Sequence, residues 1–182
     1  ASDLYHEIDG VRYWAAKWQE RLEQAAIKRA DKAYAPSRFV AEHYQSRYGI
    51  PVGVLRPPVG LEATPSADAQ CGLPDRYFVH FGQLIRRKGT AWLGEPLIHA
   101  FELVPSIRMV WVGRGDFNEL GKLLAGLGRH RSKVQVLYPL PKQELYAVLK
   151  RAEAAVLPSI VDNLPNTVIE SLMLGLPVIG TR

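Results

Sequence analysis

The sequence predicts an α/β protein built on a doubly wound parallel sheet, and two observations support this prediction. Five short, aliphatic and mostly continuous segments recur after Pro74, which is typical of strands buried on both faces of a parallel sheet. Segments with apolar residues at helical spacing separate them. Strands that alternate with helices in this way are joined by right-handed crossovers, which place helices on the faces of the sheet.

Before the sheet, the sequence predicts two helices and a short apolar segment. Apolar residues at spacings of three and four indicate the first helix, Val11–Ala30. These residues are Trp14, Trp18, Leu22, Ala25, Ala26 and Ala30. The apolar segment Lys32–Ala35 follows, and Ser37 then caps a second helix, Arg38–Tyr48, which ends before Gly49.

A linker separates this region from the sheet. Val52–Leu55 is a strand candidate, and the stretch Pro57–Pro74 is rich in Ala, Pro, Ser and Gly. We therefore place a domain boundary within this stretch. Residues 1–70 are expected to be the end of a first domain plus the linker, and residues 71–182 a second domain.

The second domain is predicted to contain strands and helices in alternation. The strands are Tyr77–Phe81, Ile107–Val112, Val134–Tyr138, Ala154–Leu157 and Pro177–Gly180. One helix follows Asp116, which caps it together with Glu119. The apolar stripe of that helix is Phe117, Leu120, Leu123, Leu124 and Leu127. The other helices are Leu97–Leu103, Gln143–Arg151 and Thr167–Leu174.

Composition and charge narrow the possible functions. The hydrophobic fraction of 47% suits a soluble domain, no apolar run approaches the ~20 residues that cross a bilayer, and no secretory leader is expected. Cys71 is the only cysteine, which excludes an internal disulfide and a thiolate zinc site built from this chain alone. The net charge is +5, and the basic residues are scattered apart from one dense group, Arg86–Lys88. This distribution favours a small anion over nucleic acid as the partner. We expect a cytoplasmic protein.

The loop after the first strand is a candidate anion site, because an open parallel sheet binds its ligand beyond the carboxyl ends of its strands. This loop begins with Gly82, which allows close backbone approach, and contains the cations Arg86, Arg87 and Lys88. Such cations suit a diphosphate, with lysine as a point charge and arginine as a forked donor. The alternative is a solvated basic loop.

Two further loops lie at the same edge of the predicted sheet. Gly113 and Gly115 resemble part of a dinucleotide-binding motif, but its third glycine is missing, and a tight turn needs no ligand. After the fourth strand, a polar loop leads into a helix near Pro165 or Asn166, and a helix amino terminus can bind an anion. Glu170, about one turn inside, can accept hydrogen bonds from two ribose hydroxyls. The alternative is a surface glutamate, although the apolar residues after it favour a position facing the strand ends.

The run Asp162–Ile179 resembles the signature of family 4 retaining glycosyltransferases. This signature has two acidic residues with seven between them, here Asp162 and Glu170, followed by a small-Gly-x-Pro-Val turn. Gly82–Gly89 resembles the family's diphosphate loop, and Val112–Gly115 resembles its nucleotide-side turn. Ala30–Ser37 resembles the last strand of the family's first domain. The resemblance covers roughly Arg29–Arg182. It implies a fragment that contains the Rossmann-like donor-binding half of a GT-B fold.

The resemblance also implies a role for each matching residue. The donor diphosphate would be contacted by Gly82, Gln83, Arg86, Arg87 and Lys88. The transferred sugar would meet Asp162, at the first acidic position, and the backbone of Asn163, Leu164 and Pro165. The ribose would bind Glu170, and the base would be bordered by Gly113, Gly115 and Tyr138. No metal or other cofactor is expected, because the cations and the helix terminus can supply the positive field.

The chain departs from the family pattern in three ways. Asp162 stands where glutamate is commoner, which shortens the reach of the carboxylate. Gln83 stands where an arginine is usual, so Arg86 or Arg87 would substitute. Most of the first domain and the closing helices are missing. His6 is a candidate for the histidine that commonly faces the donor sugar in this family, and a surface histidine is the alternative.

The implied activity is transfer of a sugar from a nucleoside diphosphate sugar to a hydroxyl acceptor, with retention of anomeric configuration. Cations and helix N–H groups would stabilise the charge that develops on the departing phosphate. The alternatives are a non-catalytic nucleotide-sugar-binding module, an epimerase or phosphorylase on the same fold, and a pyrophosphate-binding dehydrogenase. The fragment alone is expected to bind donor weakly at best and to transfer nothing. Peripheral membrane contact would come from the absent N-terminal domain.

Overall fold

The computed structural model describes residues 13–66, 72–115 and 117–181, which form two compact units. The first unit runs to Pro58 and includes residues 161–165, and the second contains the remainder. This division lies before the boundary predicted near residue 70. The reason is that Leu61 and Ala63 of the linker pack against the core of the second unit. The domain assignment itself remains a prediction.

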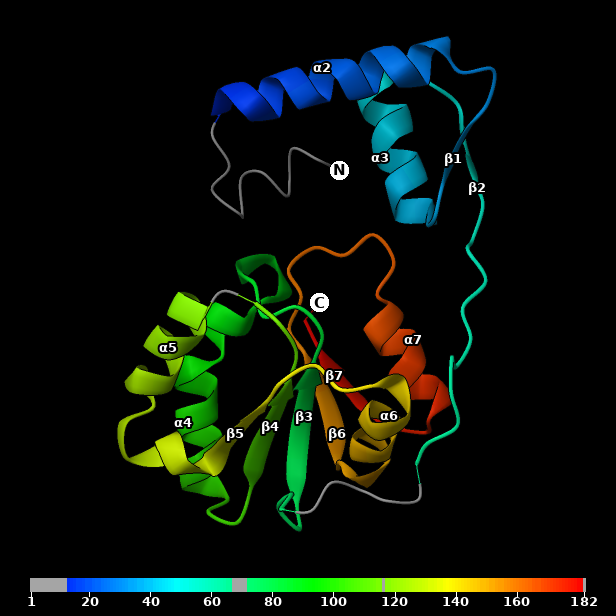
Figure 1. The fold of residues 1–182 in the computed structure, drawn as a ribbon. Helices are drawn as coiled ribbons and strands as arrows, with labels where there is room; N and C mark the ends of the chain where they lie inside the picture. The colour runs from blue at the N-terminus through cyan, green and yellow to red at the C-terminus, as the bar shows by residue number, and fades with distance from the viewer. Residues whose placement is uncertain (1–12, 67–71, 116, 182) are drawn as a thin grey trace. The chain divides into compact units, whose positions relative to one another are not determined.

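The second unit contains a five-stranded, fully parallel sheet in the order β5-β4-β3-β6-β7 (Figure 1). Its strands are β3 (Tyr77–Phe81), β4 (Arg108–Val112), β5 (Val134–Leu137), β6 (Ala154–Leu157) and β7 (Val178–Gly180). When the five strands are numbered 1 to 5 along the chain, their order across the sheet is 3-2-1-4-5. This is the arrangement of a dinucleotide-binding Rossmann sheet, and it confirms the predicted fold class. Strand order reverses between β3 and β6, which makes their carboxyl ends the topological switch point.

Helices pack on both faces of this sheet, as Figure 1 shows. On one face lie α4 (Gly94–Leu103) and α5 (Phe117–Gly126), which cover Met109 and Trp111 of β4. On the other lie α6 (Lys142–Arg151) and α7 (Asn166–Met173). The stripe residues Leu120, Leu123 and Leu127 are buried as predicted. The predictions for Asp116 and for the side chains of Phe117 and Glu119 lie outside the described residues.

The helix predicted to start at Leu97 begins earlier, at Gly94. Two 3-10 turns, η1 (Arg86–Lys88) and η2 (Thr90–Trp92), precede it. The second turn leads directly into α4, because the Leu93 N–H bonds the Thr90 carbonyl and the Leu93 carbonyl then accepts from Leu97. A third turn, η3 (Gly128–Lys133), leads into β5.

The first unit contains α2 (Tyr13–Arg29), β1 (Ala33–Ala35), α3 (Arg38–Tyr48) and β2 (Val52–Val54). β1 and β2 pair in parallel around α3. As predicted, Ser37 caps α3, since its hydroxyl accepts from the Val40 N–H at 3.4 Å. Gly49 ends α3 with a φ of 65°, a left-handed conformation that favours glycine.

The predicted apolar face of α2 is not the face that packs in the first unit. Trp18 and Leu22 are 62% and 67% exposed. The helix instead contacts α3 through Glu20, which accepts hydrogen bonds from Arg47 and Tyr48, and through Ile27. The part of the prediction that concerns Trp14 lies outside the described side chains.

Candidate functional site

The switch point of the sheet brings two loops and one helix terminus together. β3 ends at Phe81 and is followed by Gly82, whose φ of 116° lies in the left-handed region. A Cβ at Gly82 would lie 3.5 Å from Cγ2 of Thr167, in the first turn of α7. The amino end of α7 therefore lies beside the carboxyl end of β3, where unpaired N–H groups and the helix dipole favour an anion.

The loop that carries the cations is tied to the loop after β6. The Ile160 N–H donates to the Arg87 carbonyl at 3.0 Å. Gly89 has a φ of 76°, and a Cβ there would lie 1.8 Å from the carbonyl oxygen of Pro158. Only glycine fits such a close approach. This contact and the hydrogen bond fix the two loops relative to each other, and the Arg86–Lys88 turn lies in the first of these loops.

The glycines after β4 are explained by packing against the same loop. A Cβ at Gly113 would lie 1.8 Å from the Gly82 carbonyl oxygen, and one at Gly115 would lie 2.1 Å from that of Leu84. The Leu84 N–H donates to the Arg114 carbonyl at 2.7 Å, so the backbones of the two loops pair here. This supports the tight-turn alternative for these glycines. Their contact with a base remains a prediction.

The cations of the loop differ in their surroundings. Arg86 is exposed, whereas Arg87 and Lys88 are half-buried. Nη2 of Arg87 lies 3.4 Å from Oε1 of Gln83, so the glutamine at the unusual position keeps an arginine near the end of β3. The Lys88 charge contributes, after burial, to lowering the pKa of His80 in β3.

Glu170 is buried rather than a surface residue, which removes the alternative raised by its sequence. It is 6% exposed, and its Oε1 accepts hydrogen bonds from Lys142 Nζ at 2.5 Å and Tyr146 Oη at 3.3 Å. Burial lowers the pKa of Lys142, but the hydrogen bond and charge of Glu170 outweigh this and raise it above the ordinary value. Sequence reasoning missed Lys142 and Tyr146. The available signal was their spacing of four on one face of a helix that follows a strand's carboxyl end.

The remaining predicted site residues are placed as follows. Tyr138 follows β5 and is 76% exposed, so its ring lies against solvent. Asp162, Asn163, Leu164 and Pro165 lie in the loop between β6 and α7, within the segment 161–165 that belongs to the first unit. Their roles toward a sugar remain predictions, and His6 lies outside the described residues.

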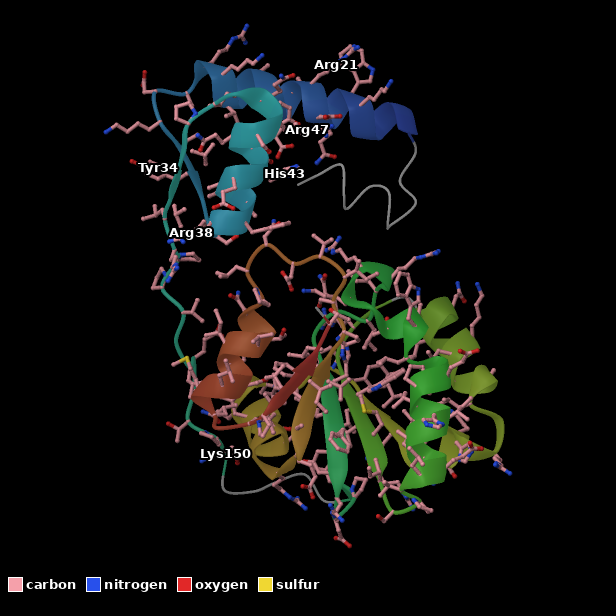
Figure 2. All side chains as sticks on the ribbon, turned by 180° about the vertical axis from the view of Figure 1, so that it is seen from behind. Arg21, Tyr34, Arg38, His43, Arg47 and Lys150 are labelled. Atoms are coloured by element: carbon pink, nitrogen blue, oxygen red, sulfur yellow. The ribbon has the colours of Figure 1, made fainter. Side chains whose placement is uncertain are left out.

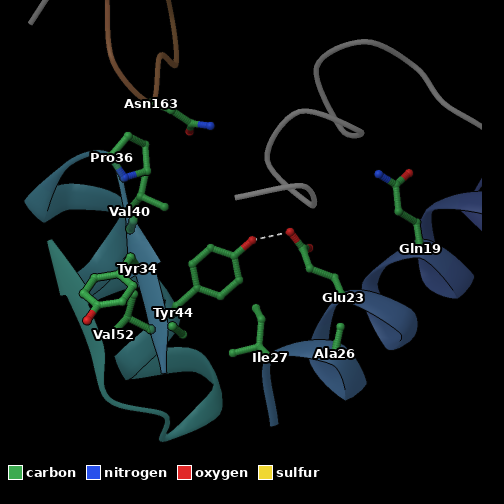
Figure 3. Close-up of a pocket in the computed structure, with 12 residues that line it drawn as sticks. Gln19, Glu23, Ala26, Ile27, Tyr34, Pro36, Val40, Tyr44, Val52 and Asn163 are labelled. Atoms are coloured by element: carbon green, nitrogen blue, oxygen red, sulfur yellow. Dashed lines mark hydrogen bonds between the residues drawn. The ribbon is translucent and has the colours of Figure 1, made fainter. Parts of the chain in front are cut away.

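The first unit has a pocket of its own, of 510 Å³ (Figure 3). Side chains of α2, β1 and α3 line it, and Asn163 of the 161–165 segment is also among the lining residues. On its wall the Tyr44 hydroxyl donates to Oε1 of Glu23. This contact joins α2 to α3.

His80 of β3 is a buried polar group beside the candidate site. Its Nδ1 lies 2.9 Å from the Val156 carbonyl oxygen, so Nδ1 carries the proton and donates. Among the residues that the structure describes, Nε2 has no hydrogen-bond partner, and it is fully buried. The same holds for Nε1 of Trp111, whose ring meets that of His80 edge-on at 6.4 Å. Burial lowers the pKa of His80 to about 4, so the imidazole is neutral at neutral pH.

The described residues offer neither a cluster of metal ligands nor a helix that could cross a membrane. Among residues 13–66, 72–115 and 117–181, no three His, Cys, Asp or Glu side chains cluster as metal ligands would. Within the same part of the chain, every helix is too short or too polar to cross a bilayer. The expectation that no metal takes part remains a prediction.

Comparison with known proteins matches residues 75–182 to the glycosyl transferases group 1 family. An uncharacterized glycosyltransferase of Methanocaldococcus jannaschii, MJ1059, is 33% identical over 106 residues, which is 57% of this chain and 25% of that protein. Sucrose-phosphate synthase of Thermosynechococcus elongatus has a similar fold, with a TM-score of 0.74 and 23% identity, over 98% of this chain and 47% of that one. HepE of Anabaena, solved with UDP and glucose, has a TM-score of 0.72 and 16% identity, over 88% of this chain and 47% of that one. The chain thus spans a quarter of the curated relative and about half of these solved structures.

Proposed function

Since this chain belongs to the glycosyl transferases group 1 family, we propose that it carries the donor-binding half of an enzyme that transfers a sugar from a nucleoside diphosphate sugar to a hydroxyl acceptor, with retention of configuration. One observation carries the proposal. The basic loop after β3, the loop after β6 and the amino end of α7 meet at the switch point of the sheet. Doubly wound sheets bind their ligands at this point.

The donor diphosphate would bind at the amino end of α7, opposite the Arg86–Lys88 turn. Lys88 would act as a point charge and Arg87, held by Gln83, as a forked donor. Negative charge grows on the departing phosphate as the bond to the sugar breaks. Fixed cations and N–H groups would stabilise that charge more in the transition state than in the bound donor, which is how they would accelerate transfer.

The rest of the donor would extend from this point. Glu170 would accept hydrogen bonds from the ribose hydroxyls, and the turn at Gly113 and Gly115 would border the base together with Tyr138. Asp162 would face the transferred sugar, beside the backbone of Asn163, Leu164 and Pro165. HepE was solved with UDP and glucose, which supports a nucleotide sugar as the class of donor.

Calorimetric titration of this chain with UDP, GDP and ADP, and with their glucose and mannose derivatives, would test the proposal. We expect measurable binding of one nucleoside diphosphate. Lys88→Ala and Glu170→Ala should each weaken it roughly tenfold or more, because each removes a hydrogen bond to or from a charged group. Unchanged affinity in both variants would reject the site.

Matched controls keep a general loss of folding from counting as support. Lys150 is exposed in the last turn of α6 (Figure 2), and Glu153 forms an exposed ion pair with Arg76 just before β6. Lys150→Ala and Glu153→Ala remove the same charges at the opposite edge of the sheet. They should leave affinity within about twofold, since surface charges there contribute little.

A further inference from the structure

Two side chains of α6 hold the carboxylate of Glu170. Lys142 and Tyr146 are four residues apart and therefore lie on one face of the helix. Nζ of Lys142 lies 5.5 Å from the centre of the Tyr146 ring, so the two side chains stack as they approach Glu170 of α7. In Figure 1 these two helices lie on the same face of the sheet.

The orientation of the Tyr146 hydroxyl is set by a third residue. Its oxygen lies 3.4 Å from the backbone N–H of Glu62 and accepts from it. The hydroxyl proton is therefore available for Glu170, whose Oε1 lies 3.3 Å away. Tyr146 is fully buried, which keeps this direction of donation fixed.

Both donors reach the same carboxylate oxygen. Lys142 Nζ and the Tyr146 hydroxyl each contact Oε1, and among the described residues none donates to Oε2. A carboxylate this buried stays ionised only when a cation and hydrogen bonds compensate for its lost hydration. An ionised carboxylate is acceptor-only, whereas a protonated one has a donor on one oxygen. The two ribose hydroxyls donate hydrogen bonds, so they need the form of the carboxylate that only accepts.

We infer that Lys142 is a positioning residue for the donor nucleotide. It holds Oε1 of Glu170 and so turns the carboxylate for Oε2 to accept from the ribose hydroxyls, with Tyr146 as a second support. The inference rests on the proposed function, because it takes Glu170 as the ribose ligand. The raised pKa of Lys142 is consistent with it, since the ammonium stays charged throughout the neutral range.

The ribose hydroxyls provide a direct test. Affinity is measured by calorimetry for UDP, GDP and ADP and for their 2′-deoxy forms, and the variants are then titrated with the pair that binds most tightly. Lys142→Met should weaken binding of the ribonucleotide roughly tenfold but that of the 2′-deoxy form by less than about threefold. Lys142→Arg retains the cation and should stay within about threefold of the unmodified chain. Lys150→Met, at the other end of the same helix, should change neither affinity.

If Lys142→Met does not fold by circular dichroism, Tyr146→Phe is judged by the same comparison of the ribonucleotide with its 2′-deoxy form, with a loss of about threefold expected for one neutral hydrogen bond.

The outcomes distinguish the two proposals. Equal losses for the ribonucleotide and its 2′-deoxy form, or no loss at all, would overturn the role of Lys142 while the donor site stands. Absence of binding of all three nucleotides to the unmodified chain would overturn the proposed function, and the role of Lys142 with it.

Discussion

Acidification should destabilise the second unit through one side chain, His80. The imidazole has a pKa of about 4 in the folded chain, against 6.5 for an unperturbed histidine. The unfolded chain therefore binds a proton that the folded chain does not, and stability falls as pH drops below 6.5 until it levels off below about 4. With 1.36 kcal/mol for each pKa unit, the full loss is about 3 kcal/mol.

The structure explains why burial determines this pKa. His80 is 2% exposed. Among the described residues, no acceptor lies within hydrogen-bond distance of Nε2, so a proton on Nε2 would be buried without a partner. The hydrogen bond from Nδ1 to the Val156 carbonyl favours the charged form, and the charge of Lys88 disfavours it. Loss of hydration is the larger effect, so the neutral imidazole is retained.

Urea unfolding at pH 7.5, 6.5, 5.5 and 4.5 would measure the effect, with His80→Asn as the comparison. The asparagine Nδ2 can replace the Nδ1 donor toward Val156 but does not titrate. Because carboxylates titrate in both proteins, the informative quantity is the difference in the free energy of unfolding between them. From pH 7.5 to pH 4.5 the unmodified chain should lose about 2 to 3 kcal/mol more of its free energy of unfolding than His80→Asn does.

The exposed His99 provides the control, since His99→Asn should show no such shift. A difference between the unmodified chain and His80→Asn that stays within about 0.5 kcal/mol over this range would refute the reasoning. It would mean that the folded chain accommodates the imidazolium, for example by hydrating Nε2.

Further predictions concern the glycines and one helix cap, each read from thermal or urea unfolding of this chain. Gly89→Ala should lower stability by more than about 2 kcal/mol and weaken nucleotide binding, because its Cβ would overlap the Pro158 carbonyl oxygen. Gly121→Ala, in α5 with open space around its Cβ, should instead raise stability by about 0.5 to 1 kcal/mol; a loss there would contradict the packing argument. Ser37→Ala should cost about 1 kcal/mol by removing the acceptor of the Val40 N–H, and an unchanged midpoint would show that the cap contributes nothing.

The fold could be predicted from the sequence because its central strands β3, β4 and β6 are mostly buried. Short continuous aliphatic runs that lie between helical segments, such as Ala154–Leu157, are typical of buried parallel strands. The predicted strand bounds agree with the structure to within one residue. Periodicity did not identify the packed face of α2. There the contacts are made by Glu20 and Ile27, and the partners of a glutamate depend on a helix that comes later in the chain.

The candidate site shows the same division between local and long-range information. The glycines and cations around Gly82 and Lys88 stand close together in the chain, so their place in one loop could be anticipated. Lys142 is different, because a lysine in the first turn of a helix is ordinarily solvated, and its partner lies 28 residues later. Only the packing of α6 beside α7 turns it into the counter-ion of a buried carboxylate. The physical chemistry of Glu170 therefore depends on a residue outside its own motif: the acidic pattern supplies the carboxylate, and the neighbouring helix decides which of its oxygens can still accept a hydrogen bond.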